Sequence, residues 1–331
     1  MIGRPVTGFR HRIACFLLAA LWITAGDAAA AEDYPSHPIR IIVPFATGGP
    51  ADIYARFLGQ RFQEALGQPV VVDNRPGAGS IIGTDAVAKA APDGYTLLLM
   101  SNTHTVNETL IPSKPYALLR DFVPIAPINY SDLVLVLNPK VPASSVEELL
   151  KLARAQPGKL SYASSGPGTP YHMAGELFKA MAGVDILHVP YRGSSAARTD
   201  VIGGQVDMMF DAVTTMAEPA KAGRVRAIGT SGRSRSLVLP SVPTIAEAGV
   251  PGYEAVIWLG LMAPRGTPSP IVNRLNAEVQ KVTRRNDVRD DWGRQGATPM
   301  TMGTEEFERF VADDIAKWAR IVKISGAKPE Q

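Results

Sequence analysis

Short runs of branched apolar residues alternate with helical patterns along most of this chain, and that alternation limits its fold more than any other feature. The run at residues 39–43 is rich in isoleucine and valine and stops at Pro44, as a buried strand does. A helical pattern with Ile53, Phe57 and Phe62 on one face follows. Next come a predicted strand at 70–72, a helix at 82–90 and a strand at 95–100. This βαβαβ order predicts an open α/β sheet with mainly parallel strands.

A second α/β unit is predicted from residue 133 onward. Its predicted strands are 133–137, 160–163, 186–189, 206–210 and 225–230, with helices at 146–155 and 171–181. The chain then returns to the first unit through a strand at 258–262 and helices at 270–285 and 304–323. Two sheets joined by two crossing segments are typical of a hinged, two-lobed binder. We therefore predict lobe 1 from residues 34–130 plus 255–331 and lobe 2 from 131–254, with the C-terminal helix packed on lobe 1.

The first 31 residues have the order of a secretory signal peptide. Arginines at 4, 10 and 12 precede a short apolar segment at 13–24, and alanines occupy 28–31. That segment is shorter than the ~20 residues that span a bilayer. The single cysteine, Cys15, lies before the apolar segment ends, which argues against a lipid anchor. We expect cleavage near Ala31 and export to the periplasm, where a mature chain without cysteine depends on a packed core.

The charge pattern and the missing motifs argue against several classes of function. The formal net charge is +3, with 34 Lys and Arg against 31 Asp and Glu, and no basic run makes nucleic acid a good partner. The sequence has no G-x-S-x-G, H-E-x-x-H or phosphate-binding loop motif. The histidines beyond residue 31 lack metal-ligand spacing, and we interpret His104 and His172 as hydrogen-bonding residues at helix starts. We expect no catalytic activity, no metal and no cofactor.

Two strand-to-helix loops have the composition of an anion site. Residues 44–52 and 164–172 each combine glycines with a proline suited to the first position of a helix. Such loops lie at the carboxyl edge of an open sheet, where backbone N–H groups of a helix N-terminus hold an anion without Lys or Arg. Simpler roles are also open, because Asp52 suits a first-turn acid or cap and the second loop suits a tight turn with capping hydroxyls.

Eight motifs in order resemble the substrate-binding proteins of tripartite tricarboxylate transporters, from Tyr34 nearly to the C-terminus. They are Tyr34-Pro35 with Pro38-Ile39, Val43-Pro44-Phe45-x-x-Gly48-Gly49-x-x-Asp52, Asn74-Arg75-Pro76-Gly77-Ala78-Gly79, Ala91-Pro92-Asp93-Gly94-Tyr95-Thr96-Leu97, Ser165-Gly166-x-Gly168-Thr169-x-x-His172, Val189-Pro190-Tyr191-x-Gly193, Pro243-Thr244-x-x-Glu247-Ala248-Gly249 and Trp258-x-Gly260.

The resemblance implies an α/β, type II (Venus-flytrap) periplasmic binding protein fold: two open mixed sheets flanked by helices, with a two-segment hinge. It also implies that both loops bind a ligand carboxylate through backbone groups, hydroxyls and water. The implied contacts are Phe45, Ala46, Thr47, Gly48, Gly49 and Asp52 in lobe 1, and Ser164, Ser165, Gly166, Gly168, Thr169 and His172 in lobe 2. Asn102, His104, Tyr191 and Asp211 follow other strand ends and are expected to line the cleft.

The expected ligand is a small organic carboxylate, namely a di- or tricarboxylate, an acidic amino acid or an aromatic acid. The family partner is a two-component integral membrane permease, and we expect the receptor itself to be a monomer. Two other functions stay open at this point. One is a periplasmic sensor that presents its ligand to a signalling receptor, and the other is a secreted enzyme.

Overall fold

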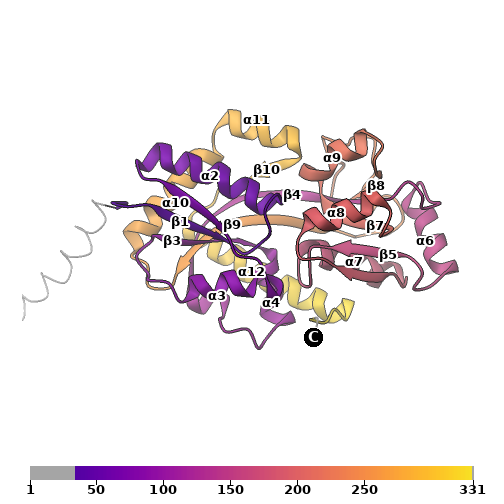
Figure 1. The fold of residues 1–331 in the computed structure, drawn as a ribbon, viewed down its shortest axis with the longest axis horizontal. Coiled ribbons are helices and arrows are strands. Elements are labelled where there is room, and N and C mark those ends of the chain that lie inside the picture. Colours follow the sequence, from indigo (N-terminus) through magenta and orange to yellow (C-terminus); the bar gives the residue numbers. More distant parts are fainter. Residues whose placement is uncertain (1–33, 330–331) are drawn as a thin grey trace, which may run out of the picture.

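The computed structural model describes residues 34–329, so the predicted signal peptide at 1–31 lies outside the described residues. Figure 1 shows two lobes side by side, joined by strands that run through both. The strands are β1 (Ile39–Val43), β2 (Val70–Asn74), β3 (Thr96–Ser101), β4 (Phe122–Leu137), β5 (Ser161–Ser164), β6 (Leu187–Pro190), β7 (Met208–Ala212), β8 (Arg226–Thr230), β9 (Val256–Pro264) and β10 (Ala297–Pro299). None of the described helices is long and apolar enough to cross a membrane.

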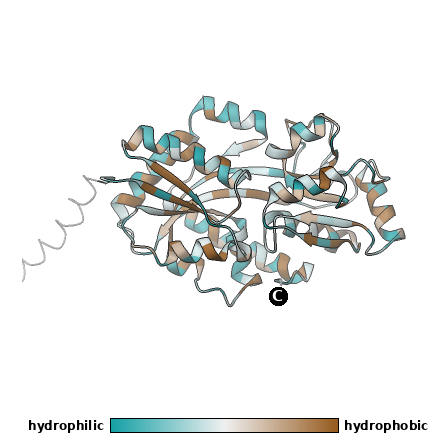
Figure 2. Cartoon of the chain, viewed as in Figure 1, coloured by the Kyte–Doolittle hydropathy of each residue, from teal (hydrophilic) through white to brown (hydrophobic). Residues whose placement is uncertain are grey.

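The helices lie on both faces of the sheets. They are α2 (Pro50–Leu66), α3 (Ile81–Ala88), α4 (Asn102–Leu110), α5 (Leu118–Asp121), α6 (Val146–Ala155), α7 (Pro170–Ala182), α8 (Ser194–Gly203), α9 (Val213–Lys221), α10 (Ser269–Thr283), α11 (Asn286–Gln295) and α12 (Thr304–Ser325), with a short 3₁₀ turn at Ala78–Ser80. Figure 2 shows apolar residues concentrated on the inner strands and polar residues on outward helix faces such as that of α11. The α/β architecture expected from the sequence is confirmed.

Strand β4 joins the two sheets into one strand path, in the order β2-β1-β3-β9-β4-β7-β5-β6. It is 16 residues long. Its first part, from Phe122 to Asp132, pairs antiparallel with β9, and its last part, Leu133 to Leu137, pairs antiparallel with β7 and β8. The sequence predicted only the last part of β4. The lobe boundaries after residues 130 and 254 stay predictions, and β4 crosses the first of them without a break.

Strand alternation explains why both faces are covered. In β4, Leu133, Leu135 and Leu137 pack in one core cluster with α6 and α7, while Val134 and Val136 pack in another with α8 and α9. Successive side chains of a strand point to opposite faces, so a continuous apolar run buries both. We call the part around β1, β2, β3 and β9 lobe 1, and the part around β5, β6, β7 and β8 lobe 2.

Helix α12 packs on lobe 1 through Phe307 and Val311, which share a cluster with Met100 and Trp258. Further along, Trp318 and Val322 of α12 form a smaller cluster with residues of α4 and with Met173 of α7. The C-terminal helix therefore covers lobe 1 and reaches lobe 2.

We expect Phe307→Ala to destabilise the protein by about 3–5 kcal/mol, because it empties a fully buried site. The Phe307 ring lies against Gly260 of β9, where an added Cβ would be 2.4 Å from the ring. Urea unfolding measures the change. The matched control is Ile324→Ala in the same helix, which is 69% exposed and should shift stability by no more than about 0.5 kcal/mol. Equal effects of the two substitutions would contradict this packing.

Candidate ligand-binding site

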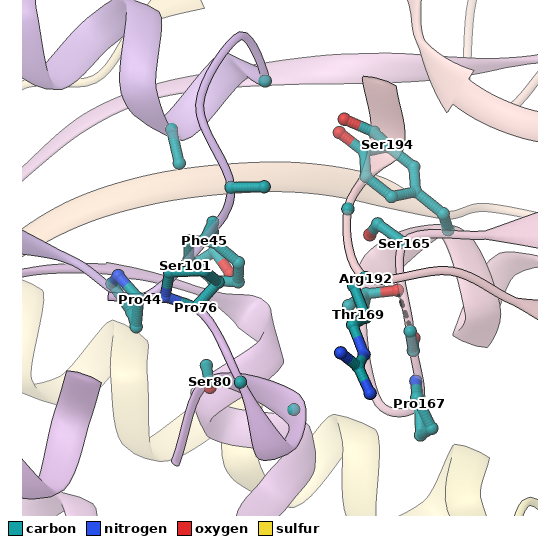
Figure 3. Close-up of a pocket in the computed structure, with 18 of the residues that line it drawn as sticks. Pro44, Phe45, Pro76, Ser80, Ser101, Ser165, Pro167, Thr169, Arg192 and Ser194 are labelled. Atoms are coloured by element: carbon teal, nitrogen blue, oxygen red, sulfur yellow. Dashed lines mark hydrogen bonds between the residues drawn. The ribbon is translucent and has the colours of Figure 1, made fainter. Parts of the chain in front are cut away.

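A cavity of about 890 Å³ lies between the two lobes. Figure 3 shows its two walls, with Phe45, Pro76 and Ser80 on one side and Ser165, Thr169 and Arg192 on the other. Side chains of β9 contribute Ile257 and Leu259. The lining residues are 44–46, 49–51, 76–82, 101, 111, 165–167, 169–171, 190–194, 257, 259 and 329. The volume lies in the range of small-molecule sites.

Five helices of the described chain begin at this cavity. Their N-cap residues are Gly49 for α2, Ser80 for α3, Ser101 for α4, Thr169 for α7 and Gly193 for α8, and all five line it. The caps of α2, α3 and α8 make no side-chain hydrogen bond to the first turn. The first N–H groups of a helix have no partner inside the helix and carry partial positive charge. The convergence of these termini makes the cavity favourable for an anion.

Side-chain charge adds little to this potential. Among the described residues, the cavity lining contains no Asp, Glu, Lys or His, and its one formally charged side chain is Arg192. Arg192 is exposed and lies beside Thr169 in Figure 3. The absence of lining carboxylates leaves the backbone dipoles unopposed at the cavity surface.

Asp52, the third residue of α2, fixes the lobe 1 loop by hydrogen bonding to its backbone. Its Oδ2 accepts the Gly48 N–H at 3.0 Å, and its Oδ1 lies 2.9 Å from Nη2 of Arg56. Burial alone would raise the pKa of Asp52, but the hydrogen bonds from Gly48 and Arg56 lower it overall. On the other side of the loop, Nδ2 of Asn74 donates to the Phe45 carbonyl at 3.1 Å. Asp52 thus has the capping role that the sequence suggested.

The lobe 2 loop is built on the same plan. Nδ1 of His172, the third residue of α7, accepts the Gly168 N–H at 3.1 Å. The Thr169 hydroxyl donates to the Gly166 carbonyl at 2.7 Å, and Oγ of Ser164 accepts the Gly166 N–H at 3.1 Å. Gly166 and Gly168 have φ values of +121° and +72°, which favour glycine. The side chains of Ser164, Thr169 and His172 therefore hydrogen-bond to the backbone of their own loop.

The two lobes touch across the cleft. The Ser195 hydroxyl of α8 donates to the Thr47 carbonyl at 3.2 Å. A Cβ added at Gly193 would lie 2.7 Å from Cβ of Ala46, and one added at Gly79 would lie 3.3 Å from the Pro167 carbonyl oxygen. The lobes are closed on each other in this structure, and small residues allow the close approach.

Seven of the sixteen residues predicted for the site line the cavity: Phe45, Ala46, Gly49, Ser165, Gly166, Thr169 and Tyr191. The other nine, Thr47, Gly48, Asp52, Asn102, His104, Ser164, Gly168, His172 and Asp211, lie outside the lining set.

The expectation that Asn102, His104 and Asp211 line the cleft is corrected by their contacts. All three are fully buried. Asn102 donates to the Val256 carbonyl, and Asp211 pairs with Arg198 at 2.8 Å. Their contacts lie inside the protein, and His104 likewise bonds the backbone N–H of Ser101.

Two cavity segments were not predicted as part of the site: residues 76–82, and Gly193 with Ser194 at the start of α8. Residues 76–82 follow β2 and lead into α3, and they line the lobe 1 wall. Ala78 and Ser80 have φ values of +46° and +79°, which are strained for residues with a Cβ. Strained backbone of this kind gathers at functional loops. The Pro76-Gly77-Ala78-Gly79 motif was the feature of the sequence that could have indicated such a loop here. No cluster of metal-binding side chains occurs within residues 34–329.

Comparisons with known proteins agree with this geometry. The model of the "Tripartite tricarboxylate transporter family receptor" family matches residues 54–327. Protein BugT of Bordetella pertussis is 41% identical over 319 residues, which cover 94% of this chain and 98% of BugT.

Two solved structures from Rhodopseudomonas palustris are also similar. A protein solved with adipate has a TM-score of 0.87 and 35% identity, covering 90% of this chain and 100% of that one. MatC with bound malate has a TM-score of 0.82 and 32% identity, covering 87% and 100%. Because the family model and BugT each match most of the chain, the chain belongs to the tripartite tricarboxylate transporter receptor family.

Proposed function

We propose that this chain is a periplasmic receptor that captures a small organic carboxylate between its lobes and delivers it to a two-component membrane permease. The observation that carries the proposal is the convergence of five helix N-termini on a cavity lined by no acid, counted over the described residues. The relatives solved with adipate and with malate support the same ligand class. Family membership supports the permease partner and the periplasmic location.

A binding role fits the cavity chemistry better than catalysis. Ser164 and His188 make a serine–histidine contact of 2.7 Å between Oγ and Nε2. However, Ser164 is fully buried and lies outside the lining set. Burial also lowers the pKa of His188 to about 3, so its imidazole is a poor base. Because a ligand in the cavity does not reach Ser164, we assign its hydroxyl a structural role, which is to accept the Gly166 N–H.

The binding strength of such a site is sufficient without an ion pair. A partly buried helix terminus contributes up to ~2 kcal/mol per charge. Charge-assisted hydrogen bonds contribute ~1.5–3 kcal/mol each. Several such terms together reach the ~8 kcal/mol of micromolar binding after the costs of association.

A thermal-shift panel of small carboxylates tests the ligand class. A diacid present at about 100 times its dissociation constant should stabilise the protein by ~2.7 kcal/mol. The control is the neutral diamide of the same acid, which lacks the charge and should give no shift. A panel in which diamides or sugars shift the melting temperature and no carboxylate does would contradict the proposal.

Gly49→Val tests closure over the cavity. Gly49 has φ −90°, which valine adopts without strain, but a Cβ there would lie 3.2 Å from Oγ of Ser194 in lobe 2. We expect carboxylate affinity to fall by at least about tenfold in titration calorimetry, since this bulk keeps the lobes apart. Gly303→Val is the control, because Gly303 is also an N-cap and a Cβ there meets open space. Equal affinity of the two variants would rule out this closure geometry.

Arg192→Ala tests whether the backbone or an ion pair holds the ligand. Because Arg192 is exposed, its contribution is screened, and we expect an affinity loss of less than about fivefold. The same calorimetric titration provides the value, with Arg224→Ala in lobe 2 as an exposed control away from the cavity. Complete loss of binding in Arg192→Ala alone would show that a side-chain ion pair carries the affinity.

A further inference from the structure

Three of the helices that begin at the cavity carry a hydrogen-bond acceptor at the same position, the third helical residue. The acceptors are Asp52 in α2, His104 in α4 and His172 in α7. Asp52 and His172 each accept the N–H of the residue before the N-cap, at 3.0 and 3.1 Å. His104 accepts the N–H of its own N-cap, Ser101, at 3.1 Å. The three contacts fix the backbone where each helix meets the cavity.

This position is usually occupied by Glu or Gln, whose side chain reaches back to the N-cap backbone. A carboxylate there also stabilises the helix, because it faces the positive end of the dipole. The same negative charge would oppose an anion bound at that helix terminus. In α2 the charge of Asp52 is matched by Arg56, 2.9 Å away. In α4 and α7 the acceptor is an imidazole, which is uncharged in its neutral form.

The contacts of His104 assign its proton. The Thr84 hydroxyl donates to the Ser80 carbonyl at 2.8 Å, so its oxygen accepts from Nε2–H of His104 at 3.0 Å. Nδ1 is then free of a proton and accepts the Ser101 N–H, although it also lies 3.0 Å from the Ser101 carbonyl oxygen. His104 thus ties Ser80 to Ser101, and both residues line the cavity.

The surroundings of His172 favour the same neutral state. Its ring stacks on His188 with centroids 4.2 Å apart, and Nδ1 must stay unprotonated to accept from Gly168. The charged groups nearby are Glu176 and Lys179, which pair with each other at 2.8 Å. Burial lowers the pKa of both His104 and His172 to about 4, so both imidazoles are neutral at pH 7.

We propose that His104 and His172 are positioning residues that fix the cavity-facing helix starts through an uncharged acceptor, so that the N-termini keep their positive potential for a bound anion. This inference rests on the proposed carboxylate-binding function. It differs from a purely structural role in one respect. A structural role requires an acceptor of any charge, whereas this role requires a neutral one.

Substitution of His172 by Asn and by Asp separates the two roles. Both side chains have the same size and offer an oxygen to the Gly168 N–H, and they differ in charge. We expect His172→Asn to bind a diacid such as adipate about tenfold more tightly than His172→Asp, with the difference shrinking as salt is raised. Without ligand, His172→Asp should melt lower than His172→Asn, because a carboxylate at this buried position is desolvated and Lys179 is already paired with Glu176. The salt dependence of the difference in affinity is therefore the readout that separates an effect of charge from a loss of structure.

Equal affinities of the Asn and Asp variants, or a tighter Asp variant, would overturn the inference. If the wild-type protein binds no carboxylate of the panel, the proposed function itself fails, which is a separate outcome.

A second pair of variants covers the case in which His172→Asp does not fold. Arg56→Gln leaves the charge of Asp52 unmatched, and the Arg56 side chain is 55% exposed, so folding should be retained. We expect adipate affinity to fall by about threefold or more. The control is Arg61→Gln in the same helix, because Arg61 pairs with Glu64 away from the cavity. Arg56→Gln with wild-type affinity would also overturn the inference.

Discussion

The structure depends on one backbone ladder, the continuous strand β4, which belongs to both sheets. Because β4 pairs with β9 in lobe 1 and with β7 and β8 in lobe 2, the orientation of one sheet sets that of the other. The parallel strands β1, β2 and β3 of lobe 1 and β5 and β6 of lobe 2 then end at one cleft. Each of these strands leads into a helix, so the shared ladder brings five helix N-termini to one cavity.

The cavity shows how a protein can attract an anion with very little side-chain charge. Backbone N–H groups supply a positive potential that costs no desolvation of a lysine or arginine. Such a site needs its loops held by groups that do not cancel this potential. Asp52 meets that need by pairing with Arg56, and His172 meets it by remaining neutral. The two loops therefore avoid a net negative charge at the helix start in two ways, by an ion pair in lobe 1 and by a neutral imidazole in lobe 2.

Local sequence patterns predicted β1 to β9 at least in part, the helices α2, α3, α6, α7, α10 and α12, and both glycine loops, because period, proline and glycine act locally. Strand β10 and the helices α5, α8, α9 and α11 were not predicted. The first part of β4 was missed, since Pro124 and Pro127 interrupt its pattern and its pairing with β9 is a long-range contact. Of helix α4 only the start was anticipated, through His104, because its threonines and asparagines are weak helix formers, and its burial under α12 compensates. Side-chain direction could not be predicted: Asp211 lies inside β7 and not after its end, and its side chain pairs with Arg198.

The contact of α12 with both lobes determines how the cleft can open. Trp318 and Val322 pack against Val106 and Leu110 of lobe 1 and also against Met173 of lobe 2. A clean rotation about β4 would pull Met173 out of that cluster and expose apolar surface. Sliding of α7 along α12, with a change of rotamer at Met173, would keep that surface covered at little cost, because a methionine side chain is unbranched and polarizable. The cluster of Trp318, Val322 and Met173 therefore couples the C-terminal helix to any change in the angle between the lobes.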